Sequence, residues 1–193
     1  MGSEMYAMRE EIVMQHDTAT VKRLAAIQYK TFSAKKRLIL YALSLICIAL
    51  GFGLIYRFDS VIRLVVLAFG CILLVNVGAS ASVKADKTLR AIEAQGGAFP
   101  CTQMIFFDSS VKIKEQDSKP HTLKYNDILR LAEDRLYYYL FITTDAAYMV
   151  PRCQLRDEAL FRKTLESRTG MRFSRPGSLL SLSLRDIKAS FKR

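Results

Sequence analysis

Residues able to do acid–base, nucleophilic or metal chemistry are few in this chain and lie far apart. There are two histidines, His16 and His121, and neither has a carboxylate or cysteine at metal-ligand spacing. The four cysteines form no CxxC pair. The sequence also lacks a phosphate-binding glycine loop, a GxSxG elbow and an HExxH motif. We therefore expect no enzymatic activity, no cofactor and no metal site.

The aromatic run Tyr137–Phe141 could line a binding surface. In a strand its side chains alternate, so Tyr138 and Tyr139 point to opposite faces of the sheet. Large aromatic surface is seldom left exposed. We expect both faces to be covered, one by the domain core and the other by the last helix or by Met5–Gln15. The alternative is a peptide-binding groove beside an open sheet edge.

The basic C-terminal tail, residues 171–193, is a second candidate for binding. Its apolar residues recur at helical spacing at Leu180, Leu184, Ile187 and Phe191. The basic residues that would contact an anionic membrane surface are Arg185, Lys188, Lys192 and Arg193. A solvated tail is the alternative, and the leucines from 180 to 184 also alternate as in a strand.

Two long apolar segments must position these candidates. Leu38–Tyr56 contains no charged residue and would extend roughly 28 Å as a helix, close to the roughly 30 Å hydrocarbon core of a bilayer. Val61–Val83 follows after a short link and is apolar apart from Arg63 and Asn76. A buried soluble helix seldom reaches such a length uninterrupted. The pair predicts a transmembrane helical hairpin, with spans at about 38–56 and 61–83.

Charge predicts the orientation of this hairpin. Seven basic residues flank the two spans, whereas the connecting region holds only Arg57 and Arg63. The flanking residues are Lys30, Lys35, Lys36, Arg37, Lys84, Lys87 and Arg90. This asymmetry places both termini in the cytoplasm. Residues 84–169 hold 14 basic and 12 acidic groups, so the net charge of +11 does not lie on the folded body. We therefore exclude nucleic acid as a partner.

The spans also carry small and polar residues suited to helix packing. The candidates are Gly51, Gly53, Asn76 and Gly78. Each glycine has a small residue four positions away, namely Cys47, Ala49 and Ser82, and such pairs let another helix approach closely. A polar group at depth can hydrogen-bond to a neighbouring helix. We expect packing within the hairpin, with homo-oligomerisation as the alternative.

After residue 98 the pattern changes to short alternating segments separated by turns, and a helix begins near Asp157. Residues Tyr6–Met14 alternate in the same way and need a sheet to join, since an isolated strand is not stable in water. We divide the chain into an N-terminal strand (1–16), juxtamembrane helices with the hairpin (17–97), a cytoplasmic domain (98–170) and the tail (171–193).

The segments IFFDSSVKIK, HTLKYNDILRLAEDRLYYYLFITTDAAYMVPRCQL and DEALFRKTL, together with two spans after an N-terminal strand, resemble the YcxB-like proteins over roughly residues 5–168. The features that carry the resemblance are Lys124–Ile128, Tyr138–Leu140 and Pro151–Arg152; Leu155 departs from it. The resemblance implies a membrane-anchored pleckstrin-homology-like domain and no established activity. The expected fold is an α+β membrane protein, with a transmembrane hairpin and a small antiparallel β barrel or roll capped by a C-terminal helix.

We expect a non-enzymatic binding or adaptor protein of the bacterial inner membrane. Its expected partners are the lipid bilayer, an unknown protein or peptide and, as a further alternative, another copy of the chain. A second reading is a small subunit of a membrane transport or signalling assembly that interacts through its hairpin. An enzyme with an unrecognised site is a third and weaker reading.

Overall fold

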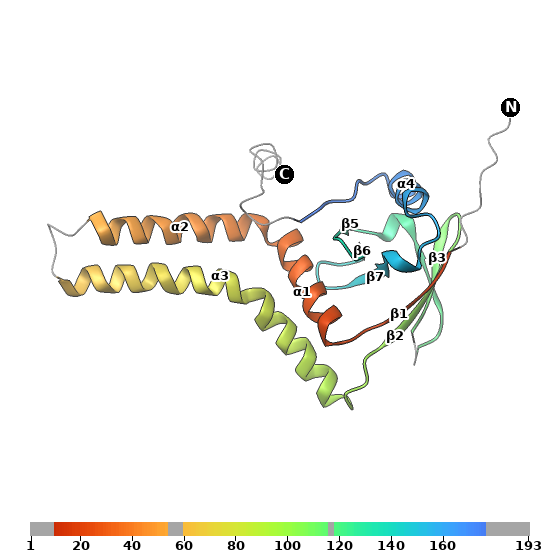
Figure 1. Cartoon of the computed structure of the whole chain (residues 1–193), viewed down its shortest axis with the longest axis horizontal. Helices are drawn as coiled ribbons and strands as arrows, with labels where there is room; N and C mark the ends of the chain where they lie inside the picture. Colours follow the sequence, from red (N-terminus) through yellow and green to blue (C-terminus); the bar gives the residue numbers. More distant parts are fainter. Residues whose placement is uncertain (1–9, 54–59, 116–117, 177–193) are drawn as a thin grey trace.

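The computed structural model describes residues 10–53, 60–115 and 118–176. Seven strands and two shorter helices form a body, from which two long helices project side by side (Figure 1). The long helices are inserted between the first and second strands, so the chain enters the body, leaves it and returns.

The first sheet joins segments from both sides of this insertion. Its strands, in spatial order, are β1 (Glu10–Gln15), β2 (Cys101–Phe106), β3 (Ser110–Glu115) and β4 (His121–Lys124). All neighbours are antiparallel, and β1 pairs with β2 from Glu10 opposite Phe106 to Gln15 opposite Cys101. Ile12 and Met14 of β1 point into the core, and the residues that alternate with them are exposed. The alternating pattern of this segment therefore matches its burial.

The second sheet contains β5 (Arg130–Glu133), β6 (Tyr137–Phe141) and β7 (Ala147–Pro151), again antiparallel. The expected barrel or roll takes the form of two antiparallel sheets that do not form a closed barrel, since no backbone ladder joins them within the described residues. A 3₁₀ turn at Tyr125–Asp127 carries the chain from one sheet to the other. The outer edge of β1 pairs with a side chain instead: Val13 N–H donates to Gln154 Oε1 (3.0 Å), and Gln154 Nε2 donates to Val13 O (2.8 Å).

Helix α4 (Glu158–Thr169) closes one side of the core. Asp157 caps its first turn by accepting from the Leu160 N–H (2.9 Å), and Gly170 ends it with a positive φ of 66°. Phe161 is buried against the rings of Phe106 and Tyr138, with centroids 5.1 and 5.6 Å away. Burying such a side chain contributes about 1.5–3 kcal/mol.

Helix α1 (Thr18–Phe32) covers the other face of the second sheet. Asp17 and Thr20 form a capping box at its start, since each backbone N–H donates to the other side chain at 2.7 Å. At its end Phe32 meets Phe141 edge-on, with centroids 5.0 Å apart. Both faces of β6 are thus covered, as expected. The covering element on the outer face is α1, however, rather than the last helix or the N-terminal strand.

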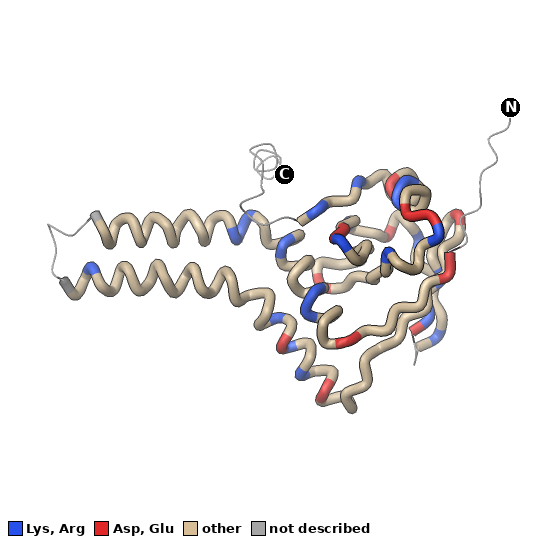
Figure 2. Tube along the Cα trace, viewed as in Figure 1, with Lys and Arg blue, Asp and Glu red and all other residues tan. Residues whose placement is uncertain are grey.

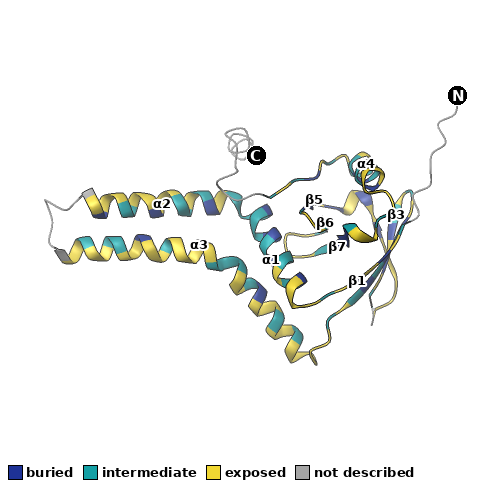
Figure 3. Cartoon of the chain, in the orientation of Figure 1, coloured by how far each residue is buried: buried dark blue, intermediate teal, exposed yellow. Residues whose placement is uncertain are grey.

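The projecting helices are α2 (Ala34–Gly53) and α3 (Ser60–Ala94). They pack against each other, and the Ser44 hydroxyl donates to the Gly70 carbonyl across the contact at 2.8 Å. Exposed residues run along both helices (Figure 3), and most of the exposed large apolar side chains lie there. Within the described residues α3 alone is long and apolar enough to cross a membrane. The first predicted span falls partly on α2, and its last residues, 54–56, lie outside the described ranges.

Helix α3 extends beyond the predicted second span and bends on its way to the body (Figure 1). The stretch Gly78–Ser82 is rich in small residues, and the Ser80 hydroxyl donates to the Asn76 carbonyl one turn earlier (2.6 Å). Such back-bonding is a known cause of helix bending. The helix ends before Gly96 and Gly97, which both have positive φ, as this glycine pair predicts.

Candidate functional site

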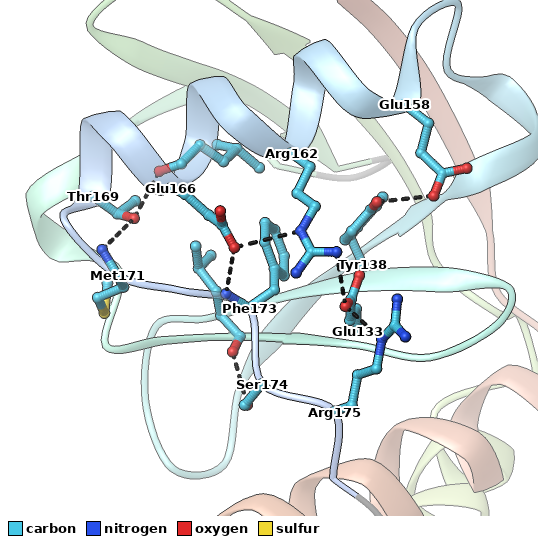
Figure 4. A network of polar contacts seen from close by, with 12 residues as sticks. Glu133, Tyr138, Glu158, Arg162, Glu166, Thr169, Met171, Phe173, Ser174 and Arg175 are labelled. Carbon is cyan, nitrogen blue, oxygen red and sulfur yellow. Dashed lines mark hydrogen bonds and ion pairs between the residues drawn. The ribbon is translucent and has the colours of Figure 1, made fainter.

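A buried carboxylate at the end of β5 is surrounded by three arginines, of which Figure 4 shows Arg162 and Arg175. The side chain of Glu133 is 0% exposed. Its Oε2 accepts from Arg152 Nη2 at 2.6 Å, while Oε1 lies 2.7 Å from Arg175 Nε and 3.3 Å from Arg162 Nη1. A charge that is withdrawn from water must be paired, and here several separate segments supply the pairing.

Each arginine comes from a different segment of the body. Arg152 follows Pro151, which ends β7 and starts a 3₁₀ turn. Arg162 lies on α4, where it also contacts Glu166 one turn later (3.4 Å). Arg175 comes after α4, in a segment that returns to β5. Glu133 therefore fixes the end of β5 relative to β7, α4 and this returning segment.

We call the returning segment, Met171–Pro176, the strap. It lies along the edge of β5 and forms a parallel bridge between Ser174 and Ala132. The Ser174 N–H donates to the Leu131 carbonyl (3.1 Å), and the Glu133 N–H donates to the Ser174 carbonyl (2.9 Å). The strap thus extends the second sheet beyond β5 by a single parallel bridge.

The strap also places an aromatic ring between β5 and α4. Phe173 is buried, its ring centroid lies 4.7 Å from that of Tyr138, and its N–H donates to Glu166 Oε1 (2.9 Å). On the same tyrosine, the Arg152 guanidinium lies 4.4 Å from the ring centroid and Glu158 accepts from the hydroxyl (3.0 Å). Burial, together with the bond to Glu158, raises the pKa of Tyr138 to about 12, so its hydroxyl remains a donor at neutral pH.

The next residue, Asp134, fixes the opposite side of the sheet. Its carboxylate accepts from the N–H groups of Leu136 and Tyr137 (both 2.8 Å), from the Tyr139 hydroxyl (2.8 Å) and from Arg23 of α1 (3.1 Å). Burial opposes its charged form, but these hydrogen bonds together hold the pKa of Asp134 below its ordinary value. Two adjacent acidic residues therefore hold two different elements, α4 with the strap and α1.

The histidines lie elsewhere in the body. His121 Nε2 is 3.0 Å from the Tyr148 hydroxyl, which donates to Glu115 (3.3 Å). Burial and the neighbouring Glu115 raise the pKa of Tyr148 to about 12, so it is no base at neutral pH. Burial lowers the pKa of His16. No group of three potential metal ligands occurs within the described residues.

Two open pockets indent the body. The first has a volume of about 400 Å³ and lies by Asp108 and Arg168, which form an ion pair of 2.9 Å. The second has a volume of about 390 Å³ and lies beside the Glu133 network, where Arg152 and Glu158 line it. Neither lining includes a histidine. These pockets offer charged and aromatic side chains for contact with a ligand.

The four residues predicted to pack helices together have different surroundings in the structure. Gly51 faces Leu67 of α3 closely enough that a Cβ there would lie 2.5 Å from Leu67 Cγ. Gly78 has nothing within 4 Å of such a position, Asn76 is exposed, and Gly53 ends α2. The predicted membrane-contact residues of the tail, Arg185, Lys188, Lys192 and Arg193, lie outside the described residues.

Sequence reasoning missed both the strap and the main contact of the hairpin. Gly70 lies under α2, where an added Cβ would stand 3.2 Å from the Ser44 carbonyl. The signal in the sequence was that each predicted span has a small residue, Ser44 or Gly70, at a similar distance from the connecting loop. For the Glu133 network, the signal was an acidic residue directly after the apolar residues Leu131 and Ala132 at the end of a strand, because a charge buried there would need cationic partners.

The family model described as YcxB-like protein matches residues 106–165, from the end of β2 into α4. No curated protein and no solved structure matches the chain. The matched range is narrower than the resemblance expected from the sequence, and it contains Glu133, Arg152 and Arg162 but not the strap. The predicted resemblance is thereby confirmed: residues 106–165 of this chain are similar to the YcxB-like family.

Proposed function

We propose that the chain is a membrane-anchored, non-enzymatic binding or adaptor protein whose body lies on the cytoplasmic side of a bacterial inner membrane. In this proposal α2 and α3 form a transmembrane hairpin, and the two sheets with α4 form a pleckstrin-homology-like domain. The order of the strands, four in one antiparallel sheet and three in the next, followed by a helix, supports that comparison.

The observation that carries the proposal is the apolar outer surface of α2 and α3. Ile39 of α2 is 61% exposed and Leu64 of α3 is 68% exposed. Other large apolar side chains exposed on these helices are Leu43, Leu45, Ile46, Leu50, Phe52, Val61, Ile62, Val65, Phe69, Ile72, Leu74 and Val75. Each Å² of apolar surface that stays exposed to water costs roughly 25 cal/mol relative to burial in an apolar environment. A hydrocarbon environment therefore suits this surface.

The charges support the orientation. Lysines and arginines gather where the helices meet the body, on the first turn of α2 and the last part of α3 (Figure 2). Arg63 lies near the opposite end of α3, where its long side chain can reach the outer headgroups. Basic residues at the body end favour placing the body in the cytoplasm, together with both ends of the chain.

A second candidate function is a subunit of a larger membrane assembly that associates through the hairpin. The open surface around Gly78 favours it, because a small residue without a neighbour on α3 leaves room for a helix of another chain. Replacing Gly78 with Leu would then abolish co-purification of that partner. An adaptor acting through its body would keep its partner in the same variant.

Thiol labelling in intact cells tests the anchor and its orientation. Single cysteines replace Ser60 at the start of α3 or Ser118 in the body, in a chain whose native cysteines have been removed. The native cysteines are Cys47, Cys71, Cys101 and Cys153. A membrane-impermeant maleimide should label position 60 in intact cells and position 118 only after lysis. Labelling of position 118 but not 60 in intact cells would overturn the orientation. Release of the chain by alkaline carbonate would overturn the anchor itself.

A further inference from the structure

We propose that the groove between β5 and α4, which the strap fills, is a binding site for an extended peptide. The peptide would carry an aromatic residue followed two positions later by an arginine. This inference builds on the proposed binding function by naming the site and the class of partner. It is independent of the membrane anchor, which the labelling experiment tests alone.

The first set of contacts that the groove offers is to the backbone of a peptide. The edge of β5 offers the Glu133 N–H and the Leu131 carbonyl, and the strap uses both through Ser174. Any extended peptide can make the same two bonds, because they involve no side chain of the ligand. A sheet edge that already accepts a strand from its own chain has the geometry to accept one from another.

The side chains on either side of that bridge supply selectivity. Phe173 and Arg175 are two positions apart, so in an extended segment both point to the same face. Figure 4 shows both directed at the body: Phe173 lies beside Tyr138 under α4, and Arg175 reaches Glu133. The groove therefore combines an aromatic pocket with a carboxylate at the spacing of alternate strand residues.

Charge favours a cationic ligand once the strap has left. Three carboxylates (Glu133, Glu158 and Glu166) would then face two guanidiniums (Arg152 and Arg162), a local charge of −1. Removing Arg175 leaves Glu133 short of one of its partners. An incoming arginine would restore that pairing, and bidentate carboxylate contacts favour arginine over lysine.

The strap is short enough to exchange with such a peptide. It holds β5 through a single bridge, and the side chain of Arg175 remains 73% exposed. A tethered strap competes at an effective concentration on the order of millimolar. A free peptide at micromolar concentration should therefore bind poorly to the wild-type chain and well to a chain whose strap is weakened.

The test uses the full-length chain in detergent and a fluorescein-labelled peptide of sequence MRFSRP, corresponding to Met171–Pro176. Binding is measured by fluorescence anisotropy. A chain carrying Phe173→Ala and Arg175→Ala should bind this peptide at least tenfold more tightly than the wild-type chain does. A peptide with alanine in place of phenylalanine should lose the binding. Arg172→Ala is the matched control, because Arg172 is exposed in the same strap and its loss removes the same charge.

A second variant guards against misfolding. Ser174→Pro removes both the N–H and the hydroxyl that donate to the Leu131 carbonyl, and it does not change Phe173 or Arg175. It should also expose the Glu133 amide, so hydrogen exchange of that amide accelerates and slows again when peptide is added. A folded variant with a rapidly exchanging Glu133 amide and no peptide binding would overturn the proposal. If both variants unfold, millimolar peptide is added to the wild-type chain, where absence of saturable binding would overturn it equally.

Discussion

The body and the projecting helices use the same apolar residues in opposite ways. Phe161 of α4 is 1% exposed and packs on two other rings, whereas Phe69 of α3 is 52% exposed and faces outward. The body is therefore stabilised by removing large side chains from water. The hairpin turns such side chains outward and is held by the contacts between its two helices.

The two regions also differ in what allows close packing. In the body, large rings meet edge-on or tilted, as Phe32 and Phe141 do. Between α2 and α3 a glycine lets the other helix approach closely instead, as Gly70 does beside Ser44 and Gly51 does beside Leu67. Small residues at helix contacts are typical of membrane helices, where surrounding lipid is as apolar as the side chains. The comparison predicts that the two regions respond differently to the same kind of substitution.

The largest difference is expected for removal of a phenylalanine ring. Phe161→Ala leaves a cavity beside Phe106 and Tyr138 and should destabilise the body by about 3–5 kcal/mol. Phe69→Ala is the matched change in the hairpin and should leave the stability of the body unchanged, because the ring lies outside it. Urea unfolding of the detergent-solubilised chain, followed by near-ultraviolet circular dichroism, measures both. Equal losses would show that body and hairpin do not differ in this way.

A smaller effect is expected from enlarging a glycine of α3. Gly70→Val places methyl groups against Ile48 and the Ser44 carbonyl, and such overpacking costs about 1–3 kcal/mol. Gly78→Val is the control, since nothing lies within 4 Å of its added Cβ.

Spin labels at Ile39 and Val75, both exposed on the two helices, report the result. The distance between them should lengthen or broaden with Gly70→Val and stay the same with Gly78→Val. An unchanged distance in both variants would contradict the close contact at Gly70.

The smallest effect is expected in the body at α1, the helix that leads into α2, where Asp134 ties α1 to the second sheet. Its pKa in the folded chain lies below the ordinary value of 3.8, so its charged form favours the folded state. That stabilisation is present above pH 3.8 and is lost as the pH falls through the lowered pKa. Asp134→Asn keeps an acceptor oxygen but removes the charge, at a cost of about 1 kcal/mol at neutral pH.

Thermal unfolding as a function of pH checks this prediction. The melting temperatures of the wild-type and Asp134→Asn chains should differ at pH 7 and converge in strong acid. Asp145→Asn is a suitable control, because that carboxylate lies at the surface, where solvent weakens its contacts with Lys84 and with the Thr144 hydroxyl. A difference between wild type and Asp134→Asn that persists unchanged in acid would exclude the charge as its cause.

Much of the body was predictable from local pattern. The alternation of apolar and polar residues predicted strands close to β2, β3 and β4, and the turn residues between them predicted where they end. The helix at Glu158–Thr169 followed from its cap at Asp157 and its stop at Gly170. These features are encoded within a few residues, so the sequence displays them directly.

The candidate site was much less predictable. Glu133 and Arg175 are far apart in the chain, and nothing local to either indicates the other. The strap follows a helix that ends normally at Gly170, so its return to β5 depends on the position of the sheet edge. Similarly, the amphipathic pattern of α1 indicates a buried side but not which surface it covers.

The sequence by itself determined the separation into an apolar hairpin and a mixed body, the alternation of the strands and the ends of the helices. These features depend on the spacing of apolar side chains, on where charged residues lie and on helix caps. Each of these signals involves residues that are close together in the sequence. Only the tertiary structure decided that α1 covers the outer face of β6, that the sheets remain unclosed and that three arginines meet at Glu133. The reason is physical: a buried charge or aromatic face demands a partner, but many segments can meet that demand, and the geometry of the whole chain selects one.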